Sequence, residues 1–432
     1  MFMFLKFKAN TKVIENFEGA SIILFREKSI LKKDCNKSGL YVLKMCDGLH
    51  TFEDIINQIN KDFNKISEDQ VEATRMFIKE YIDAGIIDLV NDPEGVEINV
   101  IGHENLVVPV NVSMEVTNRC QLKCLHCFNE SGKKRKGEIE VDKFIELAKV
   151  FVEIGVHSFF ITGGEPMLKK NVENLISFLG KHACTVTIAS NGLLLRERIL
   201  NILSTFPNIG VQVSLDGLEK NHDFIRGVKG AFNRTVDNIG RMTEKRIPVS
   251  ISFTMNDYNK DDLEGLIQLC RNLNCLGVSI GLTSNAGRAK TNEIPLKVAR
   301  DFIDILQNFH RKYTTDDFYV GLDICEKKIS KIMDNIAYPN KCGAGYHEIH
   351  IMANGEVTPC PAISNIILGD VKQNDIFEIL DISNLRRIMG IPSPIRNICG
   401  DCQHYDTCGN CIASMFEVSE SECKVQREII KI

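Results

Sequence analysis

The chain has 432 residues, enough for two or three domains that each bury a hydrophobic core. Its net charge of −5 gives no general attraction to nucleic acid or to anionic membranes, and 44% hydrophobic residues are typical of a soluble protein. No uninterrupted apolar run reaches the roughly 18 residues of a spanning helix. The N-terminal segment MFMFLKFKAN lacks the basic region and cleavage site of a signal peptide, so we predict a strand there and a cytoplasmic protein.

Residues 1–95 are predicted to form a separate domain. The runs KVIENF, SIILF and SIL indicate strands, and a first helix contains SGLYVLKMC. A second helix begins at the N-cap Thr51, and a third begins at Ser67 with Gln70 as its capping-box partner. Gly85 marks the end of the third helix, and IIDLV follows as a strand. Strands combined with three helices are typical of a winged-helix domain.

Residues 96–109 are predicted to be a linker, and residues 110–320 alternate strand-like runs with amphipathic helical segments. The runs are VNVSMEV, SFFIT, CTVTIAS, GVQVSLD, VSISFTM and LGVSIGL. This alternation predicts an α/β fold with a parallel sheet, as a barrel or part-barrel with its active site at the C-terminal rim. Residues 321–432 are less regular and rich in cysteine, as in a small domain held together by metal.

Sixteen cysteines in a reducing compartment favour metal binding or catalysis over disulfides. Three of them, Cys120, Cys124 and Cys127, lie within eight positions just after the first strand of the predicted barrel. Iron–sulfur clusters take thiolate ligands, and a four-iron cluster held by three thiolates keeps one iron open for a substrate. A zinc knuckle that borrows a distant fourth ligand is the alternative. The scattered cysteines are typical of small core residues; most of these lie in apolar or helical contexts: Cys35, Cys46, Cys184, Cys270, Cys275 and Cys325.

The chain resembles the radical S-adenosylmethionine (SAM) superfamily, whose CxxxCxxC signature appears as these three cysteines. Motifs at the ends of later strands extend the resemblance: GGEP, ASNG, SLDG and GRA. The resemblance implies a partial (β/α)6 barrel in which GGEP binds the methionine ammonium of SAM. It implies that the next two motifs contact the ribose and the methionine, and that the arginine pairs with the SAM carboxylate. The positions concerned are Gly163, Gly164, Glu165, Ser190, Asn191, Ser214, Asp216 and Arg288.

The resemblance also implies the chemistry, in which a 5′-deoxyadenosyl radical made from SAM abstracts a hydrogen atom from the substrate. A flavodoxin or ferredoxin is then the expected electron donor. No side-chain general base is predicted. His126 and Phe128 either flank the adenine or pack within the loop. The basic run SGKKRKGE at 131–138 either attracts an acidic flavodoxin or peptide or is a solvated loop.

The C-terminal cysteines resemble those of a SPASM domain, which carries two auxiliary clusters in radical SAM enzymes that modify peptides. With the SAM-binding cluster, this implies three [4Fe-4S] clusters. The run ends in CxxC where the family has CxxxC, which leaves the ligand assignment open, and a zinc-ribbon pair is the alternative. The second auxiliary cluster is assigned to Cys399, Cys402, Cys408 and Cys423. The first is assigned to Cys342, Cys360 and Cys411, completed by Cys325 or by a substrate thiolate.

The N-terminal domain is similar to the peptide-recognition element of enzymes that modify ribosomally made peptides. The similarity implies that a leader peptide pairs with an edge strand in the 20–32 region and packs against the helix at 70–83. DNA binding and a purely structural cap are the alternatives. Residues 1–95 contain 13 Lys and Arg against 16 Asp and Glu, a net charge of −3, which disfavours DNA.

Together these features predict a radical SAM maturase that installs thioether cross-links, from a cysteine sulfur to a carbon, in a precursor peptide. The same machinery could make another modification: a carbon–carbon cross-link, a decarboxylation, or oxidation of a Ser or Cys on a protein. A hypothesis of a different class is a regulator that binds DNA through its winged helix and uses its iron–sulfur clusters as redox sensors. The motifs for SAM argue against it, because a sensor has no use for SAM. No nucleic-acid or membrane partner is predicted.

Overall fold

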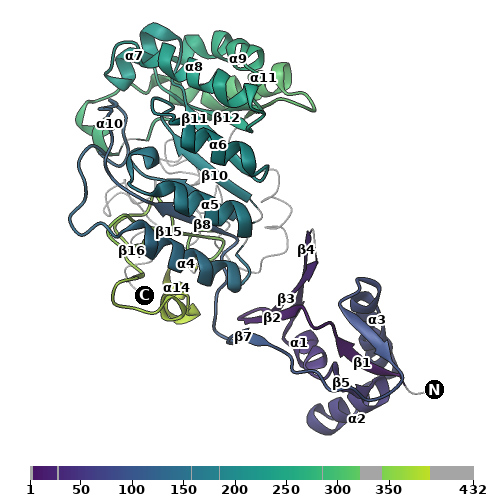
Figure 1. The fold of residues 1–432 in the computed structure, drawn as a ribbon. Helices are drawn as coiled ribbons and strands as arrows, with labels where there is room; N and C mark the ends of the chain where they lie inside the picture. The colour runs from purple at the N-terminus through teal and green to yellow at the C-terminus, as the bar shows by residue number, and fades with distance from the viewer. Residues whose placement is uncertain are drawn as a thin grey trace. The chain divides into compact units, whose positions relative to one another are not determined.

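The computed structural model describes residues 3–26, 29–156, 158–183, 185–284, 286–321 and 343–389 of the chain (Figure 1). The chain divides into two compact units, which are described separately. The first comprises Met1–Val108 together with Glu153–Gly155 and Leu380–Ser383. The second comprises Pro109–Val152, Val156–Ile379 and Asn384–Ile432.

The first unit contains two small sheets. One has the strand order β5-β1-β6, and the other has the order β4-β3-β2-β7. β4 is therefore an edge strand, whereas β3 pairs with β2 on one side and β4 on the other. The predicted edge at 20–32 is therefore confirmed only for the part that lies in β4, because β3 is paired on both sides; β7 is the other edge strand of this sheet. The strands are β1 (Phe4–Phe7), β2 (Thr11–Asn16), β3 (Gly19–Arg26), β4 (Ser29–Asn36), β5 (Asp47–Thr51), β6 (Ile87–Val90) and β7 (Val100–Gly102).

The three predicted helices of this unit are α1 (Lys37–Leu43), α2 (Phe52–Phe63) and α3 (Glu68–Asp83). Both predicted N-caps are confirmed. The Thr51 side chain accepts from the N–H of Asp54, and the Ser67 side chain accepts from that of Gln70. In each case the later side chain bonds back to the N-cap backbone, and such a cap contributes about 1 kcal/mol. Gly85 follows α3 with a φ of +69°, which suits glycine at a helix end.

The second unit is built on an open sheet with the strand order β14-β13-β12-β11-β10-β9-β8-β15-β16-β17. The six predicted strand runs are confirmed as β8 to β13, and each pairs in parallel with the next. β15, from the C-terminal region, adds in parallel beside β8. The strands are β8 (Asn111–Glu115), β9 (Ser158–Thr162), β10 (Thr185–Ser190), β11 (Ile209–Ser214), β12 (Val249–Met255), β13 (Gly277–Leu282), β14 (Tyr319–Gly321), β15 (Glu348–Ile351), β16 (Glu356–Thr358) and β17 (Gly369–Asp370).

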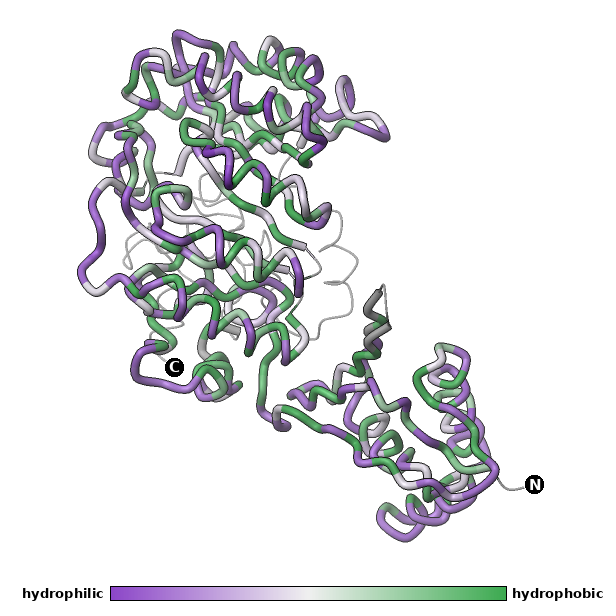
Figure 2. The backbone as a smooth tube through the Cα atoms, viewed as in Figure 1, coloured by the Kyte–Doolittle hydropathy of each residue, from purple (hydrophilic) through white to green (hydrophobic). Residues whose placement is uncertain are grey.

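Amphipathic helices connect the parallel strands and bury one face against the sheet. Figure 2 shows apolar residues alternating with polar ones along these helices. In α4, for example, Phe144, Leu147 and Phe151 are buried at helical spacing. The helices and short 3₁₀ segments (η) are α4 (Val141–Glu153), η1 (Pro166–Leu168), α5 (Val172–His182), α6 (Glu197–Thr205), α7 (Glu219–Arg226), α8 (Ala231–Glu244), η2 (Lys260–Asp262), α9 (Leu263–Asn272), α10 (Gly287–Thr291), η3 (Lys297–Arg300), α11 (Phe302–Tyr313), α13 (Ile376–Ile379) and α14 (Ile382–Met389). In the described ranges, no helix combines the length and apolar character needed to cross a bilayer.

Because β8 to β13 are parallel, their carboxyl ends lie at the same end of the sheet, and the segments that follow them all begin there. The first of these segments, residues 116–140, contains the three clustered cysteines and is called the cysteine loop below.

Candidate active site

Each sulfur of the three clustered cysteines accepts a hydrogen bond from an N–H group. Within the cysteine loop, the backbone N–H of Leu122 donates to Cys120 Sγ at 3.4 Å, and that of Ser131 donates to Cys127 Sγ at 3.4 Å. Side chains from other segments supply two more donors. Asn191 Nδ2 lies 3.8 Å from Cys120 Sγ, and Arg226 Nη1 lies 3.6 Å from Cys124 Sγ.

These donors suit sulfur in its anionic form. Burial raises the pKa of the Cys120 thiol to about 11 and also raises that of Cys124. An iron–sulfur cluster binds thiolates, and N–H groups that point at the sulfurs stabilise them, so the three residues fit such a group. In the described part of the chain, no three His, Cys, Asp or Glu side chains are placed to hold a single metal ion.

The two glycines of GGEP bring the end of β9 against the start of the cysteine loop. Gly164 N donates to Thr117 O at 2.7 Å, and Glu165 N donates to Arg119 O at 2.8 Å. A Cβ at Gly163 would lie 2.3 Å from Thr117 O, and one at Gly164 would lie 2.4 Å from Arg119 O. Only glycine allows this close approach of the two backbones.

The carboxylate of Glu165 is fully buried and ties the end of β9 to the end of β10. It accepts from Met167 N at 3.1 Å, from Asn191 N at 2.8 Å and from Ser190 Oγ at 3.0 and 3.2 Å. Burial raises the pKa of Glu165 to about 7, and these hydrogen bonds oppose the rise. The predicted contact with the SAM ammonium remains a prediction for this residue and for Ser190 and Asn191.

Asp216, which follows β11, is fully buried between Arg226 and His126. Its Oδ2 lies 2.6 Å from Arg226 Nη2 and 3.0 Å from His126 Nε2, and its Oδ1 accepts from Thr254 N at 2.9 Å. Burial disfavours the charged carboxylate, but Arg226 and His126 outweigh it and hold the pKa of Asp216 well below its usual range. The other predicted residue of this motif, Ser214, is half-buried at the end of β11.

Arg226 was missed by the sequence analysis. It lies in the last turn of α7, is 8% exposed, and links Asp216 to Cys124. The available signal was an arginine directly before the helix-ending Gly227, shortly after the SLDG motif. An arginine in a polar helix normally indicates a solvated face.

Arg288, in α10, donates three hydrogen bonds to the cysteine loop. Its Nε donates to Cys124 O at 2.9 Å, and its Nη1 donates to Ser131 O at 2.8 Å. Its backbone N–H donates to Cys127 O at 3.0 Å. The structure thus places Arg288 at the cysteine loop, and its predicted pairing with the SAM carboxylate remains a prediction.

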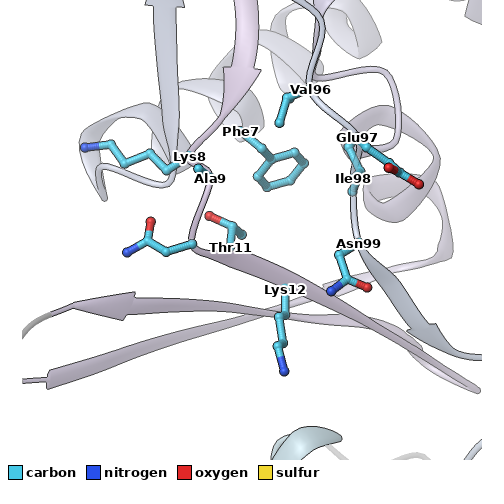
Figure 3. A pocket seen from close by; sticks show the side chains of 10 residues that line it. Phe7, Lys8, Ala9, Thr11, Lys12, Val96, Glu97, Ile98 and Asn99 are labelled. Atoms are coloured by element: carbon cyan, nitrogen blue, oxygen red, sulfur yellow. The ribbon is translucent and has the colours of Figure 1, made fainter.

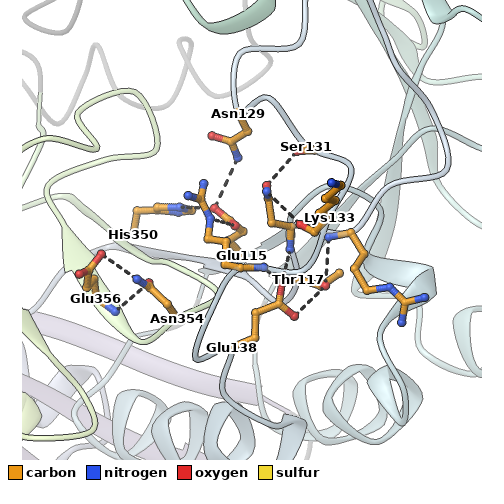
Figure 4. A network of polar contacts seen from close by, with 12 residues as sticks. Glu115, Thr117, Asn129, Ser131, Lys133, Glu138, His350, Asn354 and Glu356 are labelled. Carbon is orange, nitrogen blue, oxygen red and sulfur yellow. Dashed lines mark hydrogen bonds and ion pairs between the residues drawn. The ribbon is translucent and has the colours of Figure 1, made fainter.

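Two buried carboxylates that the sequence analysis missed anchor the second half of the cysteine loop (Figure 4). The first is Glu115, at the end of β8. Its oxygens lie 3.0 Å from Arg135 Nε, 3.4 Å from Asn129 Nδ2 and 3.7 Å from Nε2 of His350 on β15. Burial raises the pKa of Glu115, but contacts with His350 and Arg135 outweigh it and lower the pKa.

The second anchor is Glu138, which is 8% exposed. It accepts from Thr117 Oγ1 at 3.0 Å and from the backbone N–H groups of Asn118 and Arg135 at 2.9 Å each. Lys169 Nζ lies 3.8 Å from the same carboxylate. Glu138 therefore joins the two ends of the cysteine loop.

Among the predicted ligands of the auxiliary clusters, the structure describes only Cys360, which is half-buried just after β16. The others lie outside the described residues: Cys325, Cys342, Cys399, Cys402, Cys408, Cys411 and Cys423.

In the N-terminal unit, side chains of α3 contact β4. Lys33 pairs with Glu80, and Tyr81 Oη lies 3.5 Å from Asp34 O. A separate cavity of about 320 Å³ lies where residues 7–12 meet residues 96–99, with Phe7 and Thr11 in its wall (Figure 3). No β4 or α3 residue lines it, so it is distinct from the predicted leader site.

Two family models match the chain. Residues 114–270 match the radical SAM superfamily, and residues 342–412 match the SPASM iron-sulfur cluster-binding domain. The sporulation killing factor maturation protein SkfB of Bacillus subtilis (strain 168) is 27% identical over 77% of this chain and 76% of its own. The antilisterial bacteriocin subtilosin biosynthesis protein AlbA of the same organism is 26% identical over 88% of this chain and 84% of its own.

Relatives with other names also match. The AdoMet-dependent heme synthase of Nitratidesulfovibrio vulgaris is 26% identical over 71% of this chain and 88% of its own. Among solved structures, Streptococcus suis SuiB bound to precursor peptide SuiA has a TM-score of 0.63 at 16% identity. That likeness covers 97% of this chain and 100% of SuiB, and it is a likeness of fold.

Proposed function

Because the chain belongs to the radical SAM superfamily and carries a SPASM domain, we propose that this enzyme matures a ribosomally made precursor peptide by forming thioether cross-links. The names of SkfB and AlbA, a maturation protein and a bacteriocin biosynthesis protein, support a peptide product. The heme synthases among the relatives are named for a different reaction, so the kind of bond that this enzyme forms is tested by the experiment below.

The proposal depends most on the hydrogen bonds to the three sulfurs of the cysteine loop. Cys120, Cys124 and Cys127 are proposed to hold a [4Fe-4S] cluster, with the remaining iron open to SAM. When bound, the cluster and SAM supply a 5′-deoxyadenosyl radical that abstracts a hydrogen atom from the substrate. The chain's own residues position the cysteines, since Arg288 and Glu138 fix the loop and Arg226 places a positive charge at Cys124.

SAM is proposed to bind at the strand ends beside the cysteine loop. The buried Glu165 is proposed to pair with its ammonium group, because a bound cation would stabilise the carboxylate, whose pKa burial raises to about 7. Contacts from the other predicted residues complete the proposal: Gly163, Gly164, Ser190, Asn191, Ser214, Asp216 and Arg288.

The remaining cysteines are proposed to hold two auxiliary clusters in residues 321–432, after a barrel at 110–320, a linker at 96–109 and a peptide-recognition domain at 1–95. Cys360 belongs to the first auxiliary cluster with Cys342 and Cys411, completed by Cys325 or a substrate thiolate. Cys399, Cys402, Cys408 and Cys423 hold the second. Held by these residues, an auxiliary cluster would supply a ligand position for the substrate thiolate and an acceptor for the electron that leaves with each new bond.

The leader of the precursor is proposed to add as a strand to the open edge of β4 and to contact α3. The placement of Lys33 and Asp34 beside Glu80 and Tyr81 supports this, because the strand edge and the helix then form one surface. The physical basis of such binding is the row of backbone N–H and C=O groups that an edge strand leaves open.

Co-expression with a Cys-containing precursor peptide, followed by mass spectrometry, tests the proposed bond. Each thioether removes one hydrogen atom from carbon and one from sulfur, so the peptide should lose the mass of two hydrogens per bridge. Alkylation of thiols distinguishes the outcomes. Bridged cysteines resist alkylation, whereas a carbon–carbon link has the same mass loss but leaves the thiols reactive. A peptide of unchanged mass would contradict the cross-linking proposal.

A further inference from the structure

The basic run of the cysteine loop is held in place by buried contacts and presents its remaining charges to solvent. In the sequence Lys133-Lys134-Arg135-Lys136, the arginine points inward and donates to the buried Glu115 at 3.0 Å. The three lysines are exposed. The backbone N–H of Arg135 is bound by Glu138, so both buried anchors fix the same residue. Ordering a loop costs conformational entropy, and these buried contacts offset that cost. A loop that is merely solvated has no need of them.

Arg119 extends this surface. Its backbone forms a parallel bridge with Gly132, next to Lys133, and its side chain is exposed. We call Arg119, Lys133, Lys134 and Lys136 the basic face. Lys134 pairs with Glu140 at 3.8 Å, while the other three have no acidic partner in the described part of the chain. Four positive charges with one paired acid give the face a net charge of +3, in a chain whose net charge is −5.

The basic face is formed by the same backbone that carries two of the clustered cysteines. Arg119 directly precedes Cys120. Ser131, two residues before Lys133, donates its N–H to Cys127 Sγ at 3.4 Å. Both cysteines are only half-buried. A protein bound at this face would therefore lie beside two of the three proposed cluster ligands.

We propose that the basic face is the docking site for an acidic one-electron carrier protein, which delivers the electron that the SAM-binding cluster needs. The inference rests on the proposed function, because only a redox cluster at Cys120, Cys124 and Cys127 gives such a partner a role. Opposite charge on the two surfaces steers the encounter and sets its dependence on salt.

The test compares the reduction rate of the SAM-binding cluster in the reconstituted full chain with two reductants, reduced flavodoxin and dithionite. The test variant is Lys133→Glu/Lys134→Glu/Lys136→Glu. The matched control is Lys149→Glu/Lys181→Glu/Lys245→Glu, which changes the net charge equally at exposed positions of or next to α4, α5 and α8. A milder Lys133→Gln/Lys134→Gln/Lys136→Gln variant serves if charge reversal lowers the iron content.

At low ionic strength, flavodoxin should reduce the cluster of the test variant about tenfold more slowly than that of the wild type or control. The difference should disappear above about 0.5 M salt, where screening shortens electrostatic interactions to a few ångströms. Dithionite should reduce all variants equally. The docking site would be overturned if flavodoxin reduced the wild type, the Lys→Gln variant and the Lys→Glu variant at equal rates. It would also be overturned if the variants lost peptide binding while their rates of reduction by flavodoxin stayed unchanged. Absence of 5′-deoxyadenosine from wild type with SAM and dithionite would instead overturn the proposed function.

Discussion

Arg226 and Asp216 form an ion pair with Nη2 and Oδ2 2.6 Å apart, although their side chains are only 9% and 0% exposed. The same guanidinium donates to Cys124 Sγ at 3.6 Å. One arginine therefore links the residue after β11 to a proposed cluster ligand, through a contact between positions 102 residues apart in the chain.

Arg226→Met should lower the free energy of unfolding by about 3–5 kcal/mol, because it leaves Asp216 buried without its main partner. Arg226→Met/Asp216→Leu should recover much of this loss, since both charges are then gone. Chemical denaturation of the anaerobic protein measures both values. Arg198→Met is the control, because Arg198 is 70% exposed in its pair with Glu173, and should change stability by at most about 1 kcal/mol. Equal stability of the single and double variants would contradict the interpretation.

Glu165 should make the SAM-free protein less stable as the pH rises from about 4.5 to about 7. The pKa of this carboxyl is raised from 4.5 to about 7 in the fold, so its favourable contribution is present below the unfolded pKa and is lost as the pH passes the folded value. The loss amounts to about 3 kcal/mol. Glu165→Gln imitates the protonated acid and should show a flatter profile over the same window.

Adding SAM gives the discriminating comparison for Glu165. If its carboxylate pairs with the SAM ammonium, the bound cation lowers the pKa and the wild-type profile should flatten on addition of SAM. A wild-type profile that keeps its full pH dependence with saturating SAM would count against this contact while leaving the fold unaffected.

Gly164→Ala should detach the end of β9 from the cysteine loop. Its Cβ would lie 2.4 Å from Arg119 O, a backbone atom that cannot simply rotate away, and overpacking of this kind costs about 1–3 kcal/mol. Gly240→Ala is the matched control, because nothing lies within 4 Å of its Cβ in α8 and alanine favours a helix. Thermal unfolding and iron content after reconstitution measure the effect, which should be a loss for Gly164 and a slight gain for Gly240.

Proline substitutions at two neighbouring positions of β4 test leader binding at its edge. Because adjacent N–H groups of a strand point in opposite directions, one of Lys33→Pro and Asp34→Pro removes a bond to β3 and the other removes an N–H at the open edge. The substitution that removes the bond to β3 should destabilise the domain. The substitution that removes the N–H at the open edge should keep the fold, as judged by circular dichroism, yet weaken binding of a labelled leader peptide about tenfold or more. Full leader affinity in both variants would rule out pairing along this edge.

Local patterns in the sequence predicted the parts of the fold that local interactions determine. The capping boxes at Thr51 and Ser67 and the six alternating strand runs are of this kind, since each depends on residues a few positions apart. The GGEP glycines were predicted for contact with SAM, and the structure adds a second reason for them, which is close packing against Thr117 and Arg119.

The missed features depend on partners far away in the sequence. His350 reaches Glu115 from a strand 235 residues later, because β15 happens to add beside β8. The polar sequence around Arg226 indicates a solvated helix face, and only the fold brings this side chain against Asp216. The predicted edge region covered both β3 and the start of β4, because only the strand order reveals that β3 is paired on both sides while β4, among the described residues, is paired on one.

The most direct test of the account measures iron, acid-labile sulfide and 5′-deoxyadenosine in anaerobically purified protein, beside a Cys120→Ala/Cys124→Ala/Cys127→Ala variant. We expect the wild type to hold about four more iron atoms than the variant, and to release 5′-deoxyadenosine when given SAM and dithionite, which the variant should not do. Tightly bound zinc without labile sulfide, or equal iron in both proteins, would contradict the account.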